Sequence, residues 1–185
     1  MAAIHAWSDC IAMNRTVVFT IGHSNRSIDE FIDMLTHFGV DTVVDVRTIP
    51  RSRANPQFNG DGLGAKLAAH GIGYVHMAEL GGLRHARAGS KNTAWRNASF
   101  RGFADYMQTN EFRKGVTRLA GLARRSSTVV MCAEALPWRC HRSLIADALV
   151  VRGMSVIHIT GRSSQRAHTI TPWAVVSGTR ITYPG

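Results

Sequence analysis

Short runs of apolar residues alternate along this chain with segments in which apolar residues recur at helical spacing. The first run, residues 16–21, is rich in β-branched residues and ends in a polar loop that contains a glycine. A short apolar run bounded by turn residues is typical of a buried strand. The same pattern predicts further inner strands over residues 42–46, 74–77, 129–133 and 155–159.

Helical patterns follow most of these runs. Ser27 and Glu30 form a capping box, apolar residues then recur at helical spacing, and Gly39 supplies a stop. Strands that alternate with helices favour an α/β fold, in which a mainly parallel sheet carries helices on both faces. The other predicted helices cover residues 63–70, 100–107, 112–122 and 142–151.

Two segments do not fit the alternation. Residues 79–97 have few periodic apolar positions and contain three glycines, which predicts a long loop. Long loops inside compact domains are usually functional, so we expect this one to cover a site. Residues 175–181 predict a small C-terminal hairpin that turns at Ser177 and Gly178.

The length of 185 residues suits one compact domain. We expect this domain to span residues 16–185, because the first predicted strand begins at residue 16. Residues 1–15 would then form an N-terminal extension. No stretch reaches the ~18 apolar residues that span a bilayer. Residues 1–12 also lack the basic start and apolar run of a signal peptide, so we expect no membrane partner.

Composition narrows the function classes. Hydrophobic residues at 45% and charged residues at 18% exclude a wholly disordered chain. The net charge of +10 has two explanations: anionic partners such as nucleic acid or phosphorylated small molecules, or the base composition of the genome. An odd number of cysteines, Cys10, Cys132 and Cys140, makes a disulfide framework improbable and favours a cytoplasmic location.

Polar residues follow the predicted strands, and in an open parallel sheet ligands bind at the carboxyl ends of the strands. The densest group follows the fourth strand. The residues at or after the ends of the first, second and fourth strands are His23, Ser24 and Arg26, then Asp45, Arg47 and Arg51, and finally Cys132, Glu134, Cys140, His141 and Arg142.

Cys132 is the first candidate nucleophile, because a strand end or helix N-terminus with arginine nearby stabilises a thiolate. Three alternatives remain open. The two cysteines are also compatible with buried structural residues, with a thiol pair that has redox activity, and with ligands of a divalent metal ion together with His141. Arg139 lies one residue too far from Cys132 for the Cys-x5-Arg spacing of a phosphatase loop.

The remaining candidates have supporting roles. Glu134 or His23 could move a proton. Asp45 lies inside an apolar strand and needs a partner such as Arg47, Arg26 or a loop amide, which is also compatible with a structural role. The residues expected to bind an anionic substrate are Ser24, Arg26, Arg47, Arg51 and Arg142, and those that could stack on bases are Phe58, Trp95 and Trp138.

Several of these elements together resemble one known family. They are the run Thr20 to Arg26, the Asp45-x-Arg47 element with Pro50, the Leu80-Gly81-Gly82 element, the Cys132-x-Glu134 and Cys140-His141-Arg142 elements, and the C-terminal His168 to Pro184 segment. In this order they resemble the family called domain of unknown function 488. The resemblance implies that these elements belong to one site, and it implies no activity.

The sequence therefore favours an enzyme that acts on an anionic substrate containing phosphate or a nucleotide, with a divalent metal ion as the cofactor that the donor residues suggest. The alternative is a non-catalytic nucleic-acid-binding module, in which arginines contact phosphates and tryptophans stack on bases.

Overall fold

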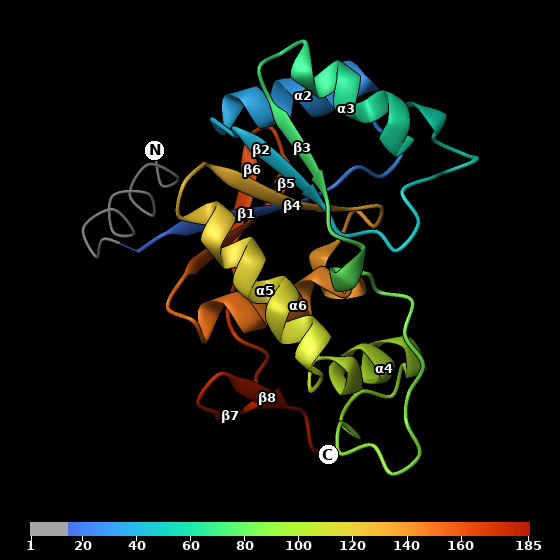
Figure 1. Cartoon of the computed structure of the whole chain (residues 1–185), viewed down its shortest axis with the longest axis vertical. Coiled ribbons are helices and arrows are strands. Elements are labelled where there is room, and N and C mark those ends of the chain that lie inside the picture. The colour runs from blue at the N-terminus through green and yellow to red at the C-terminus, as the bar shows by residue number, and fades with distance from the viewer. Residues whose placement is uncertain (1–14) are drawn as a thin grey trace.

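A six-stranded sheet forms the centre of the computed structural model, which describes residues 15–185 (Figure 1). The strands lie in the order β3-β2-β4-β1-β5-β6. Their bounds are β1 Val17–Gly22, β2 Thr42–Asp45, β3 Gly73–His76, β4 Thr128–Cys132, β5 Ser155–Gly161 and β6 Ser164–Ala167. The predicted extension, residues 1–15, lies outside the described residues except for Arg15, and Cys10 lies outside them as well.

The inner strands are parallel, as predicted. β4 lies between β1 and β2, with Gly22 opposite Cys132 and Asp45 opposite Met131. This register brings the ends of β1, β2 and β4 to one edge of the sheet. β6 pairs antiparallel with β5 and was not predicted, because its sequence, SQRA, has no apolar alternation. Such a strand at the edge of a sheet needs no buried face.

Helices cover both faces of the sheet, which confirms the predicted α/β class (Figure 1). On one face, Phe31 and Leu63 join the core that contains Ile21. On the other, Phe103 and Leu144 join the core that contains Val130. The first face carries α2 Ile28–His37 and α3 Gly60–Ala68, and the second carries α4 Ala98–Tyr106, α5 Asn110–Ala123 and α6 Arg142–Val150.

Caps fix the helix ends. The Ser27 hydroxyl accepts a hydrogen bond from the Glu30 backbone N–H at 3.1 Å, as the capping box predicts. Thr109 caps α5 through Phe112 N–H, which explains why the helical pattern breaks near residue 109. Three short 3₁₀ helices lie in the loops: η1 Pro56–Phe58, η2 Ala78–Leu80 and η3 Pro137–Arg139.

The predicted hairpin is also present. β7 Val175–Ser177 pairs with β8 Arg180–Thr182, and Gly178 adopts a φ of 59° in the turn between them. The fully buried Tyr183 then anchors the chain end, because its hydroxyl donates to Asp147 on α6 at 2.8 Å. Among the described helices, none is long and apolar enough to cross a membrane.

Candidate functional site

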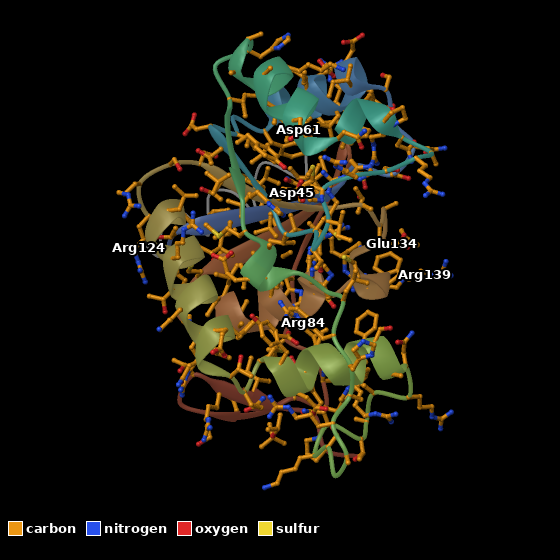
Figure 2. The ribbon with its side chains drawn as sticks, turned by 45° about the vertical axis from the view of Figure 1, so that its right-hand side comes forward. Asp45, Asp61, Arg84, Arg124, Glu134 and Arg139 are labelled. Atoms are coloured by element: carbon orange, nitrogen blue, oxygen red, sulfur yellow. The ribbon has the colours of Figure 1, made fainter. Side chains whose placement is uncertain are left out.

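A cleft of about 540 Å³ opens at the carboxyl ends of the strands. Cys132 and Glu134 line it from the end of β4, His23 from the end of β1 and Arg47 from the end of β2. In Figure 2, Glu134 and Arg139 project from this edge of the molecule, whereas Arg124 lies at the opposite edge. The structure therefore brings His23, Arg47, Cys132 and Glu134 to one cleft.

Two thiols and an imidazole form the centre of this cleft. One side-chain donor atom from each of Cys132, Cys140 and His141 lies within 4.8 Å of the others. The Cys140 Sγ lies 3.7 Å from His141 Nδ1. A hydrogen bond with Cys140 is the largest influence on the Cys132 thiol and, with His141 and the nearby Arg142 charge, holds its pKa well below the usual range despite burial. The pKa of Cys140 is raised by the same hydrogen bond and by burial.

Arg142 stands behind this centre rather than in the cleft. Its side chain is only 1% exposed, and its guanidinium donates to the carbonyl oxygens of Glu134 at 2.5 Å and Ala135 at 2.8 Å. It forms no ion pair with a carboxylate within the described residues. Arg142 was expected to bind substrate, but this geometry gives it two other roles: it fixes the loop after Cys132 and places a buried positive charge near the thiols.

Glycines allow the loops to meet at the site. A Cβ at Gly22 would lie 1.9 Å from the Glu134 carbonyl oxygen, so only glycine permits this approach of β1 to the loop. A Cβ at Gly82 would lie 2.4 Å from His141 Nδ1. Sequence reasoning identified both glycines as parts of motifs but missed this role, because the neighbours that they contact are 112 and 59 positions away in the numbering.

Asp45 is fully buried and holds Arg47. Its Oδ1 accepts from Arg47 Nε at 2.9 Å, and its Oδ2 accepts from Arg47 Nη2 at 2.6 Å and from the Tyr74 hydroxyl at 2.7 Å. The predicted pairing of Asp45 with Arg47 is confirmed. Burial lowers the pKa of Arg47, but the hydrogen bonds and charge of Asp45 outweigh it and raise that pKa. Asp45, a candidate catalytic residue, does not line the cleft, and its carboxylate is bonded to Arg47 and Tyr74.

His23 is fixed between Arg47 and Phe58. Its Nδ1 donates to the Ser24 carbonyl oxygen at 2.8 Å, which leaves Nε2 as an acceptor 3.3 Å from Arg47 Nη1. Burial is the main reason that the pKa of His23 is lowered, so the ring is neutral at pH 7. Phe58 stacks on the ring at 4.3 Å and is fully buried. The expectation that Phe58 offers a stacking surface to a ligand is therefore wrong.

The rim of the cleft is basic and apolar. Arg51 is 75% exposed, with only a 3.6 Å ion pair to Asp61, and Arg139 is exposed. Ile49 and Leu83, 61% and 71% exposed, also line the cleft. Among residues 15–185, the carboxylate that lines the cleft is that of Glu134. The rim thus combines cations with an apolar surface.

Two predicted ligand-binding residues lie elsewhere. Ser24 and Arg26 do not line the cleft. Arg26 donates to the carbonyl oxygens of Gly22 at 2.5 Å and Thr160 at 3.0 Å, so it ties the loop after β1 to the end of β5. Ser24 has a φ of 51°, an uncommon conformation for a residue other than glycine that shapes the same loop.

The loop over residues 79–97 contributes to the cleft through Gly82 and Leu83, consistent with the expected cover. Arg84, in this loop, places its guanidinium 3.6 Å from the centre of the Tyr106 ring and donates to the Gly81 carbonyl oxygen at 3.0 Å. It holds the loop on α4.

Comparison with protein families gives a match over residues 27–149 to the family described as "Domain of unknown function DUF488". The chain belongs to this family. The resemblance inferred from the motifs is confirmed, and the matched segment of DUF488 includes Asp45, Arg47, Cys132 and the Cys140-His141-Arg142 element. No curated protein and no solved structure matches the chain.

Proposed function

We propose that this DUF488 protein is an enzyme that uses the Cys132 thiolate as a nucleophile toward an anionic substrate bound in the cleft. The observation that carries the proposal is the position of Cys132 at the cleft beside the buried Arg142. A buried cation without a carboxylate partner is costly. A thiolate at Cys132 supplies the missing negative charge, and it is also the reactive form of cysteine.

The lining of the cleft supports an anionic substrate. Arg47, Arg51 and Arg139 line it against the single carboxylate of Glu134. Arginine recognises phosphate and carboxylate through paired hydrogen bonds, and Arg47 is held in place by Asp45. The exposed Ile49 and Leu83 supply apolar surface beside these cations. The substrate class that fits is a phosphate-bearing compound with an apolar or aromatic portion.

The proposed reaction is hydrolysis through a covalent intermediate. The Cys132 sulfur attacks phosphorus, an S–P bond forms, and the P–O bond to the leaving group breaks with its electron pair going to oxygen. Water then attacks phosphorus, and the S–P bond breaks to restore the thiolate and release phosphate. Glu134, exposed at the cleft, is the carboxyl group placed to exchange a proton with the leaving group or water.

The test uses p-nitrophenyl phosphate, with neutral p-nitrophenyl acetate for comparison. We expect turnover of the phosphate, a covalent phosphoryl adduct on Cys132 by mass spectrometry, and loss of both in Cys132→Ser. Arg139→Gln should raise KM at least tenfold, whereas the matched control Arg124→Gln, an exposed arginine at the opposite edge, should leave it unchanged (Figure 2). Equal activity of the native protein and Cys132→Ser, or no adduct and no turnover, would contradict the proposal.

A second candidate uses the same atoms as metal ligands. His141 Nε2 is buried without a hydrogen-bond partner among the described residues, and the three donors of the cluster suit a borderline-soft ion such as zinc. Three protein ligands leave one position for substrate. Elemental analysis separates the two candidates. About one zinc per chain, lost in both Cys140→Ser and His141→Ala, favours the metal centre. A metal-free protein that still turns over p-nitrophenyl phosphate, and loses this activity in Cys132→Ser, favours the nucleophile.

A further inference from the structure

A second pocket, distinct from the cleft, contains most of the tryptophans of the chain. It has a volume of about 260 Å³ and lies between η3, β6 and the segment that follows β6. We call it the tryptophan pocket. Its aromatic lining consists of Trp95, Trp138 and Trp173. Nothing in the proposed function uses these residues.

Indole rings form the wall and the rim of the tryptophan pocket. Trp95 stacks on Phe100 with ring centres 4.8 Å apart and meets Trp173 edge to face at 5.5 Å. These contacts fix Trp95 and one edge of Trp173. Trp173 is still 45% exposed and Trp138 is 56% exposed. Exposed indoles at a concave site provide flat apolar surface for a planar ring.

The floor of the tryptophan pocket is a rigid polar chain. His158 Nε2 and His168 Nδ1 share a hydrogen bond at 2.9 Å, and His168 Nε2 donates to Asp147 at 2.8 Å. Thr20 completes the chain, because its hydroxyl is hydrogen-bonded to His158 Nδ1 at 2.7 Å. Because every ring nitrogen already has a partner, the floor is preorganised and its histidines do not need a ligand.

Two groups of the tryptophan pocket lack partners. The Trp95 indole Nε1 is buried without an acceptor in the described part of the chain, although buried indole N–H groups usually have one. Arg166 is exposed and forms no ion pair within residues 15–185. In the described part of the chain, no carboxylate residue lines the pocket. Of these two groups the exposed one is the Arg166 guanidinium, so the pocket offers a ligand an unpaired cation.

We propose that the tryptophan pocket binds a free nucleotide. A planar base fits the indole surfaces of Trp138 and Trp173, and base stacking on aromatic side chains is the usual mode of such recognition. The exposed Arg166 in the lining supplies the cation that pairs with the phosphate. This inference goes beyond the proposed function, because the site lies outside the cleft and does not involve Cys132.

The experiment titrates the native protein with AMP, GMP, CMP and UMP and follows tryptophan fluorescence and heat of binding. Adenosine and ribose 5-phosphate test the two halves of the ligand separately. We expect quenching by at least one nucleotide and weaker binding of both halves. Trp138→Ala and Trp173→Ala should each weaken binding at least fivefold, the lower end of the range for a lost stacking partner.

Matched arginine variants test the phosphate contact. Arg166→Gln should weaken nucleotide binding at least fivefold, whereas Arg162→Gln, in the turn between β5 and β6 and outside the pocket, should leave it unchanged. Cys132→Ser should bind nucleotides as the native protein does, so failure of the proposed function does not affect this result. The inference is overturned by the absence of nucleotide binding, by binding that the tryptophan and Arg166 variants do not alter, or by binding to single-stranded oligonucleotides alone.

Discussion

Gly22 lies directly beneath the main chain of Glu134, so close that a Cβ at Gly22 would come within 1.9 Å of the Glu134 carbonyl oxygen. The same carbonyl accepts a hydrogen bond from the buried guanidinium of Arg142. The loop that follows Cys132 is therefore held between a glycine on β1 and an arginine on α6. Backbone atoms cannot move aside as a flexible side chain can, so this arrangement depends on the absence of a side chain at residue 22.

The first prediction concerns this contact. Gly22→Ala should destabilise the protein by about 3 kcal/mol or displace the loop, because overpacking against a fixed backbone forces the main chain to shift. Urea unfolding measures the free energy of unfolding, and a changed alkylation rate of Cys132 shows that the loop has moved. The control is Gly62→Ala in α3, where an added Cβ meets nothing within 4 Å and should stabilise by about 0.5–1 kcal/mol. Equal stabilities of the two variants would contradict the close approach.

The second prediction concerns the two thiols. Because the pKa of Cys132 is held low and that of Cys140 is raised, iodoacetamide should modify Cys132 first. Its rate should fall less steeply between pH 8 and 6 than that of an ordinary thiol, which slows about tenfold per pH unit in this range. Cys140→Ala removes the hydrogen bond that most lowers the Cys132 pKa and should make the fall in rate steeper, although His141 and Arg142 still lower that pKa. Peptide mapping after timed alkylation measures both rates, and preferential labelling of Cys140 would show that the assignment is reversed.

The third prediction concerns Asp45 and Arg47. Asp45→Asn should cost about 3–5 kcal/mol, since it removes one partner of a buried ion pair and leaves Arg47 without its counter-charge. The exposed pair of Asp61 and Arg51 provides the control, and Asp61→Asn should cost less than about 1 kcal/mol. Chemical denaturation of both variants tests the difference. Similar losses of stability in the two variants would mean that the ion pair of Asp45 and Arg47 contributes little to the stability of the fold.

The sequence predicted the parallel sheet, because the apolar runs and the capping residues act locally. Ser27 and Thr109 cap helices within three residues of themselves, and Gly178 turns its own hairpin. β6 escaped prediction because an edge strand needs no apolar face. Local patterns therefore determine where most elements begin and end.

The location of the candidate site could be predicted from the sequence, but the contacts of its individual residues could be predicted only in part. Parallel strands end at the same edge, so His23, Arg47 and Cys132 could be placed together from their positions after strands. The partner of each buried charge could not be deduced in the same way. Arg142 donates to carbonyl groups of the loop, a contact that only the packing of α6 against that loop creates. The alternative of a nucleic-acid-binding module stays a prediction.

The last prediction concerns acid stability. Burial is the main reason that the pKa of His158 falls to about 3 in the folded protein, with further lowering by the charges of His168, Arg142 and Arg166 and only partial opposition from Asp147. The unfolded value is about 6.5. Between these values the unfolded chain binds the proton more strongly, so the free energy of unfolding should decrease as pH falls below about 6.5, by up to about 1.4 kcal/mol per pH unit for this group.

Urea unfolding at constant ionic strength from pH 8 to pH 5 measures this slope. His23, whose pKa is also lowered by burial, contributes with the same sign, whereas carboxylates with ordinary pKa values titrate mainly below this range. His158→Gln should lower the stability at pH 8, because it breaks the chain from Thr20 to Asp147, and should flatten the slope toward pH 5. His70→Gln, at an exposed position, should change neither the stability at pH 8 nor the slope toward pH 5. A native protein that is equally stable at pH 7 and pH 5 would show that His158 accepts its proton in the folded state.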